Sequence, residues 1–78
     1  METRINKNAA KVKVLSAAQV RRLKPGTIIE HVNNKTRERG SLIVAMSYKK
    51  KVLHGIGGLI LEIRDREGWH FELPGVEP

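Results

Sequence analysis

The chain has 78 residues and no cysteine, with 15 Lys and Arg against 8 Asp and Glu, a formal net charge of +7. A chain of this length forms one small domain. Without Cys there is no disulfide framework, thiolate zinc cluster or Cys nucleophile, which favours a reducing, cytoplasmic location. The longest apolar run, residues 42–46, is too short to cross a membrane, so we expect no membrane association.

The charge is polarised along the chain. Residues 1–57 contain thirteen basic and three acidic side chains, whereas residues 58–78 contain two basic and five acidic ones. Residues 1–10 are polar and basic without periodicity, and we expect a flexible arm there. Residues 11–74 are predicted to form the single domain, followed by a short tail at 75–78.

The domain is expected to begin with a strand and a helix. Residues 11–15 alternate basic and apolar side chains, which predicts a short strand with its valines inward and its lysines facing water. Ser16 and Gln19 have the spacing of a capping box, so a short helix should start there. The Pro-Gly pair at 25–26 should end it.

The middle of the chain is typical of a hairpin. Residues 27–32 and 41–48 alternate in the manner of strands, and the polar residues 33–40 between them predict a long basic loop. The lysine tract at 49–51 either covers the end of the second strand or forms the turn into a further strand. The glycine-rich residues 55–58 should then break regular structure.

A second hairpin is predicted at the end of the domain. Residues 59–64 and 69–73 both alternate apolar and polar side chains, and residues 65–68 form a turn between them. Four or five short strands with one short N-terminal helix predict a mainly β fold, a small antiparallel five-stranded barrel. In element order and strand length, residues 11–73 resemble an SH3-like small β-barrel, an architecture that implies no single function.

Basic side chains suggest a partner. A charge run is often only a solvated face, but a net charge this large on so small a domain favours contact with nucleic-acid phosphates. We expect non-enzymatic DNA or RNA binding with low sequence specificity, in which a lone tyrosine stacks on bases. The predicted binding residues are Arg21, Arg22, Lys24, Lys35, Arg37, Arg39, Tyr48, Lys49, Lys50 and Lys51.

An alternative is a protein-interaction module. A small basic domain with a charged hairpin and no catalytic signature resembles in style the accessory proteins with which phages and mobile elements inhibit or redirect host complexes. Its acidic last hairpin, with Glu62, Glu67 and Glu72, would then dock on a host protein complex. A sheet edge could also pair two copies into a homodimer.

Enzymatic and cofactor chemistry find little support. The glycine-rich residues 54–59 lack the Lys-Ser/Thr ending and the following helix of a phosphate-binding loop, so we interpret them as a bent connection. His31, His54 and His70 are widely separated on different strands, and no metal or cofactor is predicted. An enzyme assembled from His and Glu residues across an oligomer interface is the third, least supported hypothesis.

Overall fold

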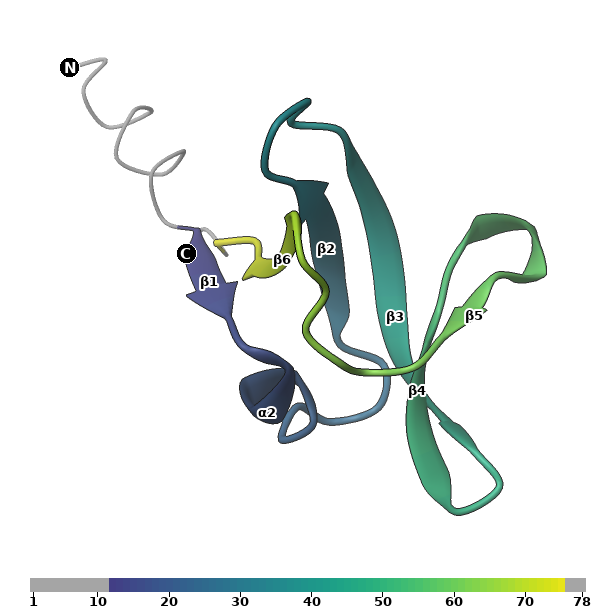
Figure 1. Ribbon diagram of the computed structural model, residues 1–78. Helices are drawn as coiled ribbons and strands as arrows, with labels where there is room; N and C mark the ends of the chain where they lie inside the picture. Colours follow the sequence, from purple (N-terminus) through teal and green to yellow (C-terminus); the bar gives the residue numbers. More distant parts are fainter. Residues whose placement is uncertain (1–11, 76–78) are drawn as a thin grey trace, which may run out of the picture.

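Six strands form one antiparallel sheet in the order β1-β6-β2-β3-β4-β5 (Figure 1). The computed structural model describes residues 12–75, so the predicted arm and all but the first residue of the predicted tail lie outside the described residues. The elements are β1 (Lys13–Leu15), α2 (Ala17–Val20), β2 (Ile28–Asn33), β3 (Arg39–Ser47), β4 (Lys50–His54), the 3-10 turn η1 (Ile56–Gly58), β5 (Ile60–Leu61) and β6 (Trp69–Leu73).

The helix α2 begins as the sequence predicts. The Ser16 hydroxyl accepts a hydrogen bond from the Gln19 amide at 3.3 Å, and the Gln19 side chain accepts one from the Ser16 amide at 2.8 Å. This capping box satisfies amides that a helix start leaves without partners. The helix proper is a single turn, and Val20 is fully buried beneath it.

The β2–β3 hairpin is confirmed, with β3 longer than predicted. The register runs from Ile28 opposite Ile43 to Val32 opposite Arg39, so pairing extends into residues that the sequence placed in the loop. The lysine tract fits neither of its two predicted positions as a whole: Lys49 lies in the turn with Tyr48, and Lys50 and Lys51 are already the first residues of β4.

The predicted last hairpin is wrong. β5 pairs with β4, whereas β6 pairs with β1 and β2. The connection between them is held against α2, because the Asp65 carboxylate accepts a hydrogen bond from the Ala17 amide at 2.9 Å and the Ile63 carbonyl accepts one from Arg21 at 2.6 Å. Ile63 is buried at this crossing, so the chain crosses the core face of the sheet, in front of β3 and β2 in Figure 1, and β6 joins the other side of the sheet.

The five-stranded closed barrel is likewise corrected to six strands in an open sheet. β1 and β5 are its two edges, and no pairing joins them within residues 12–75. These strands are three and two residues long, too short to close a barrel. The orientation of β1 also differs from the prediction, since Leu15 is buried and Val14 is 61% exposed. The mainly β class is confirmed.

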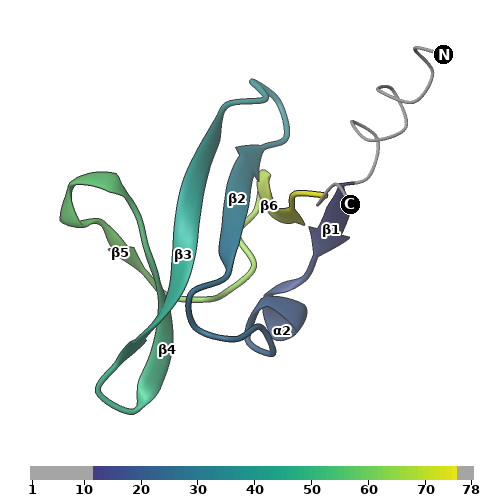
Figure 2. The same cartoon turned by 180° about the vertical axis from the view of Figure 1, so that it is seen from behind.

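The core lies on one face of this sheet. Its buried side chains come from β1, α2, β2, β3, β4, the β5–β6 connection and β6, and they are Leu15, Ala17, Val20, Ile29, Leu42, Val44, Leu53, Ile63 and Phe71. Seen from behind, α2 lies beside the lower end of the sheet, far from the β2–β3 turn (Figure 2). The helix therefore covers only one end of the core face, which leaves the other end without a helical cover.

Candidate nucleic-acid interface

Lys51 links the predicted binding residues of α2 with those of β4. The Lys51 ammonium donates hydrogen bonds to the Arg21 and Leu23 carbonyls, at 2.7 and 2.8 Å. These carbonyls belong to the end of α2 and the turn after it, where a helix leaves acceptors without partners and favours a cation. The contact places the start of β4 beside α2, so cations thirty residues apart in the sequence share one end of the molecule.

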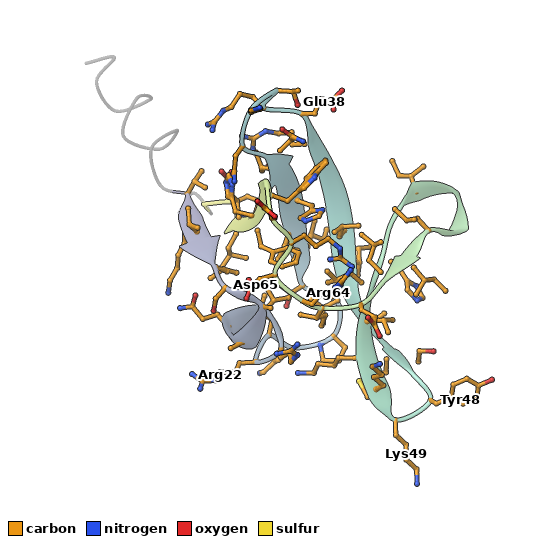
Figure 3. The ribbon with its side chains drawn as sticks, in the orientation of Figure 1. Arg22, Glu38, Tyr48, Lys49, Arg64 and Asp65 are labelled. Carbon is orange, nitrogen blue, oxygen red and sulfur yellow. The ribbon has the colours of Figure 1, made fainter. Side chains whose placement is uncertain are left out.

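We call this group the basic pole. It comprises seven cations from α2, the following turn, the β3–β4 turn, β4 and the β5–β6 connection: Arg21, Arg22, Lys24, Lys49, Lys50, Lys51 and Arg64. With Asp65, which accepts from the Ala17 amide of α2, and Arg66, which donates to the Glu62 and Arg64 carbonyls, this end of the molecule holds eight cations and two carboxylates, whereas the other described residues have four basic and four acidic side chains. The positive charge of residues 12–75 is therefore concentrated at this end, as the labelled Arg22 and Lys49 illustrate (Figure 3).

A groove of about 370 Å³ runs through the pole, lined by Arg21, Lys50, Lys51, Glu62, Ile63 and Arg64. Its cations differ in their freedom to bind a ligand. Lys51 and Arg21 donate to backbone carbonyls, and Lys50 lies 3.4 Å from Glu62 in an exposed ion pair. Sequence reasoning missed Arg64, because its position depends on the unexpected path of the β5–β6 connection.

Three cations of the pole are more available. The side chains of Arg22, Lys24 and Lys49 are exposed and make no hydrogen bond or ion pair with any other residue of the described chain. Exposed cations of this kind can meet phosphates without losing an internal partner. These three residues are therefore the strongest candidates for direct contact.

The remaining predicted cations lie at the other end of the molecule. The β2–β3 tip, residues 34–38, presents Lys35 and Arg37 to solvent, and the Asn33 side chain holds this turn by accepting the Lys35 amide at 2.9 Å. The nine residues of β3 separate the tip from the lysine tract by about 27 Å. The predicted binding residues of the loop and those of the lysine tract thus lie at opposite ends of β3.

Arg39, at the start of β3, is engaged in a network on the sheet face opposite the core. It pairs with Glu30 and with Glu72, the latter at 3.2 Å, and the His70 Nε2 lies 2.7 Å from the other Glu72 oxygen. The His70 hydrogen bond and the charge of Arg39 hold the pKa of Glu72 below its usual range, against the effect of burial. Arg39 therefore has a structural role.

The three carboxylates of the predicted protein-docking surface do not form one surface. Glu72 is buried in the network just described, at 6% exposure. Glu62 faces Lys50 within the basic pole, and Glu67 is exposed in the β5–β6 connection. The acidic hairpin to which they were assigned is absent from the described fold.

Tyr48 projects from the β3–β4 turn. Its side chain is 99% exposed, and its backbone has a positive φ of 60°, which is uncommon for a residue other than glycine. It does not pack its ring against the strand end and extends into solvent beside Lys49 (Figure 3).

A second groove, which the sequence did not indicate, lies at the end of the core face that α2 leaves uncovered. It has a volume of about 420 Å³. It is lined across the sheet by Trp69 of β6, His31 of β2, Glu38 just before β3, Arg39, Gly40 and Leu42 of β3, and Leu59 and Leu61. The His31 ring stacks on Trp69 and Phe71 with centroid distances of 4.6 and 4.9 Å. We call this the aromatic groove.

His31 is kept neutral in this setting. Burial, followed by the nearby Arg66 and His70 charges, lowers its pKa. Its Nε2 is the one buried side-chain nitrogen or oxygen in residues 12–75 without a hydrogen-bond partner. An unsatisfied buried group of this kind costs about 1–3 kcal/mol. His31 therefore makes the folded protein less stable than an apolar side chain of the same shape would.

Metal and membrane sites are not found in the described part of the chain. Its His, Asp and Glu residues form no group of three that could hold a metal ion, and none of its helices has the length and apolar character needed to cross a membrane. The glycine-rich residues 55–58 include the 3-10 turn η1, as expected for a bent connection.

Comparison with known proteins adds no family. No protein-family model matches the chain, and neither a curated protein nor a solved structure matches it.

Proposed function

We propose that this protein is a non-enzymatic nucleic-acid-binding domain that contacts phosphates through its basic pole. The observation that carries the proposal is the segregation of charge: eight cations and two carboxylates share one end, while the other described residues are balanced. Such a field attracts a polyanion and orients it. Arg22, Lys24 and Lys49 make the first contacts, and the β2–β3 tip offers a second, smaller set.

Backbone contact implies low sequence specificity, because phosphates are the same at every base. α2 is a single turn, too short to read a groove in the manner of a recognition helix. The SH3-like arrangement remains our proposal for the fold, supported by an all-antiparallel order in which the first strand pairs with the last. The cysteine-free composition supports a cytoplasmic location.

The alternative, docking on a host protein complex, has less support, because its three carboxylates are dispersed. An edge-paired homodimer would gain few hydrogen bonds, since the edge strands β1 and β5 have three and two residues. Nucleic-acid binding is therefore the function that the geometry favours.

Salt dependence tests the proposal. About four phosphate contacts on a single strand would lower the association constant roughly 50-fold between about 50 and 200 mM salt. The measurement is fluorescence anisotropy of an end-labelled oligonucleotide, single-stranded and duplex. Absence of binding at about 50 mM salt would overturn the proposal.

A charge-reversal pair locates the interface. Lys49→Glu should weaken binding several-fold, and Arg22→Glu together with Lys49→Glu should abolish it. Lys13→Glu is the matched control, because Lys13 is an exposed lysine on β1, at the opposite edge of the sheet from β5. Equal losses at Lys13 and Lys49 would show that only net charge matters and would contradict a defined pole.

A further inference from the structure

We propose that the aromatic groove binds one unstacked base of a single-stranded nucleic acid. This assignment rests on the proposed function and adds to it a site for the base, about one strand length from the basic pole. It identifies Trp69 as the stacking residue of this groove, in addition to the exposed Tyr48.

The shape of the groove fits a flat aromatic ring. Its volume of about 420 Å³ falls in the range of about 300–1,000 Å³ that ligand pockets occupy. One side is formed by Trp69, whose ring is held in place by stacking on His31, which also stacks on Phe71. The other side is formed by Leu59 and Leu61. Proteins that bind an unstacked base commonly hold it between aromatic and apolar side chains in this way.

The floor of the groove is open because it contains a glycine. Gly40 of β3 lines the groove between Trp69 on one side and Leu59 and Leu61 on the other. A Cβ added to Gly40 would meet no atom within 4 Å. Its backbone φ is not positive, so this position does not need glycine for its conformation. Glycine inside a strand costs stability and often marks the close approach of a ligand.

Charge at the mouth of the groove suits the backbone that would accompany a base. Glu38 and Arg39 line the groove, with the Arg39 guanidinium paired to Glu30 and Glu72, and the exposed Lys35 and Arg37 of the β2–β3 tip immediately precede them in the chain. Phosphates flanking the bound base would therefore meet exposed cations. The neutral His31 ring adds no charge to the groove and supports Trp69 by stacking on it.

The protein carries its own reporter for this site, since Trp69 is the single tryptophan of the chain. A base that stacks on it should quench its fluorescence. The probes are a short single-stranded oligothymidylate, a deoxyribose-phosphate oligomer of the same length without bases, a duplex and thymidine monophosphate. We expect quenching by the oligothymidylate alone, while anisotropy with end-labelled probes shows that the abasic oligomer and the duplex also bind.

A matched pair of β3 variants tests the groove itself. Gly40→Val fills the floor and should weaken oligothymidylate binding at least about 5-fold, the lower end of the effect of losing one stacked base. Ser41→Val adds a similar side chain at the next position, which does not line the groove, and should leave binding unchanged. Valine favours strands, so neither substitution is expected to unfold β3.

The outcomes separate this inference from the proposed function. Binding of all oligomers without Trp69 quenching, or equal losses for the two β3 variants, would overturn the base site and leave the basic pole standing. Quenching by thymidine monophosphate at the same affinity as by the oligothymidylate would overturn it in favour of a free nucleotide. Absence of any oligomer binding at about 50 mM salt would overturn both proposals.

Discussion

The lysine tract at 49–51 allows one prediction to be worked out in detail, because its three members have different environments. Lys51 donates to two backbone carbonyls at 2.7 and 2.8 Å, Lys50 forms one exposed ion pair at 3.4 Å, and Lys49 is solvated. Replacing each lysine by methionine removes the charge and keeps most of the length. The three substitutions should therefore differ in stability although they look equivalent in the sequence.

The expected sizes follow from these contacts. Hydrogen bonds to a charged group contribute about 1.5–3 kcal/mol, so Lys51→Met should cost about 2 kcal/mol. In a domain of this size that corresponds to a fall in Tm of about 8–16 °C. An exposed pair contributes about 0–1 kcal/mol, so Lys50→Met should have a small effect. Lys49→Met should leave the Tm unchanged.

Thermal unfolding followed by circular dichroism measures these differences, and anisotropy measures nucleic-acid binding by the same variants. Lys49→Met should weaken binding without a change in Tm, whereas Lys51→Met should lower the Tm. A Tm for Lys51→Met equal to that for Lys49→Met would refute the structural role of Lys51. It would also indicate that Lys49, Lys50 and Lys51 are all equally exposed to solvent.

Two further predictions concern stability. Because the pKa of His31 is lowered on folding, the unfolded chain takes up its proton first, and stability should fall as the pH drops below about 6.5. Urea unfolding at several pH values should show that the free energy of unfolding of His31→Phe depends less on pH than that of the unaltered protein between about pH 4.5 and 6.5. Below about pH 4.5 both proteins should lose stability, because the pKa of Glu72 is also lowered on folding. The same pH dependence in both proteins between these values would contradict this role of His31. Asp65→Ala should lower the free energy of unfolding in urea by about 1 kcal/mol, because the Ala17 amide loses its acceptor. Glu67→Ala, at an exposed position, is the control and should leave stability unchanged. Equal losses of stability in the two variants would refute the contact between Asp65 and Ala17.

Local signals in the sequence predicted local structure well. The spacing of Ser16 and Gln19 predicted the start of α2, because a capping box depends only on residues three apart. The β2–β3 hairpin followed from alternation on both sides of a polar loop. In both cases the partner residues are close along the chain, so propensity and tertiary structure agree.

Alternation alone misled where partners are distant. Residues 59–64 and 69–73 have the period of two strands, but the period does not say which strand each will join. Contacts of Asp65 and Ile63 with α2 carry the chain across the domain, so β5 and β6 end at different places in the sheet. The same contacts remove the acidic hairpin and bring Arg64 to the basic pole.

The sequence by itself determined the mainly β class, the short capped helix, the central hairpin and the excess of positive charge. These properties depend on composition and on neighbours along the chain. The tertiary structure decided the open six-stranded sheet, the division of the cations between two ends and the aromatic groove beside His31 and Trp69. Each of these depends on long-range strand pairing, which local patterns do not encode.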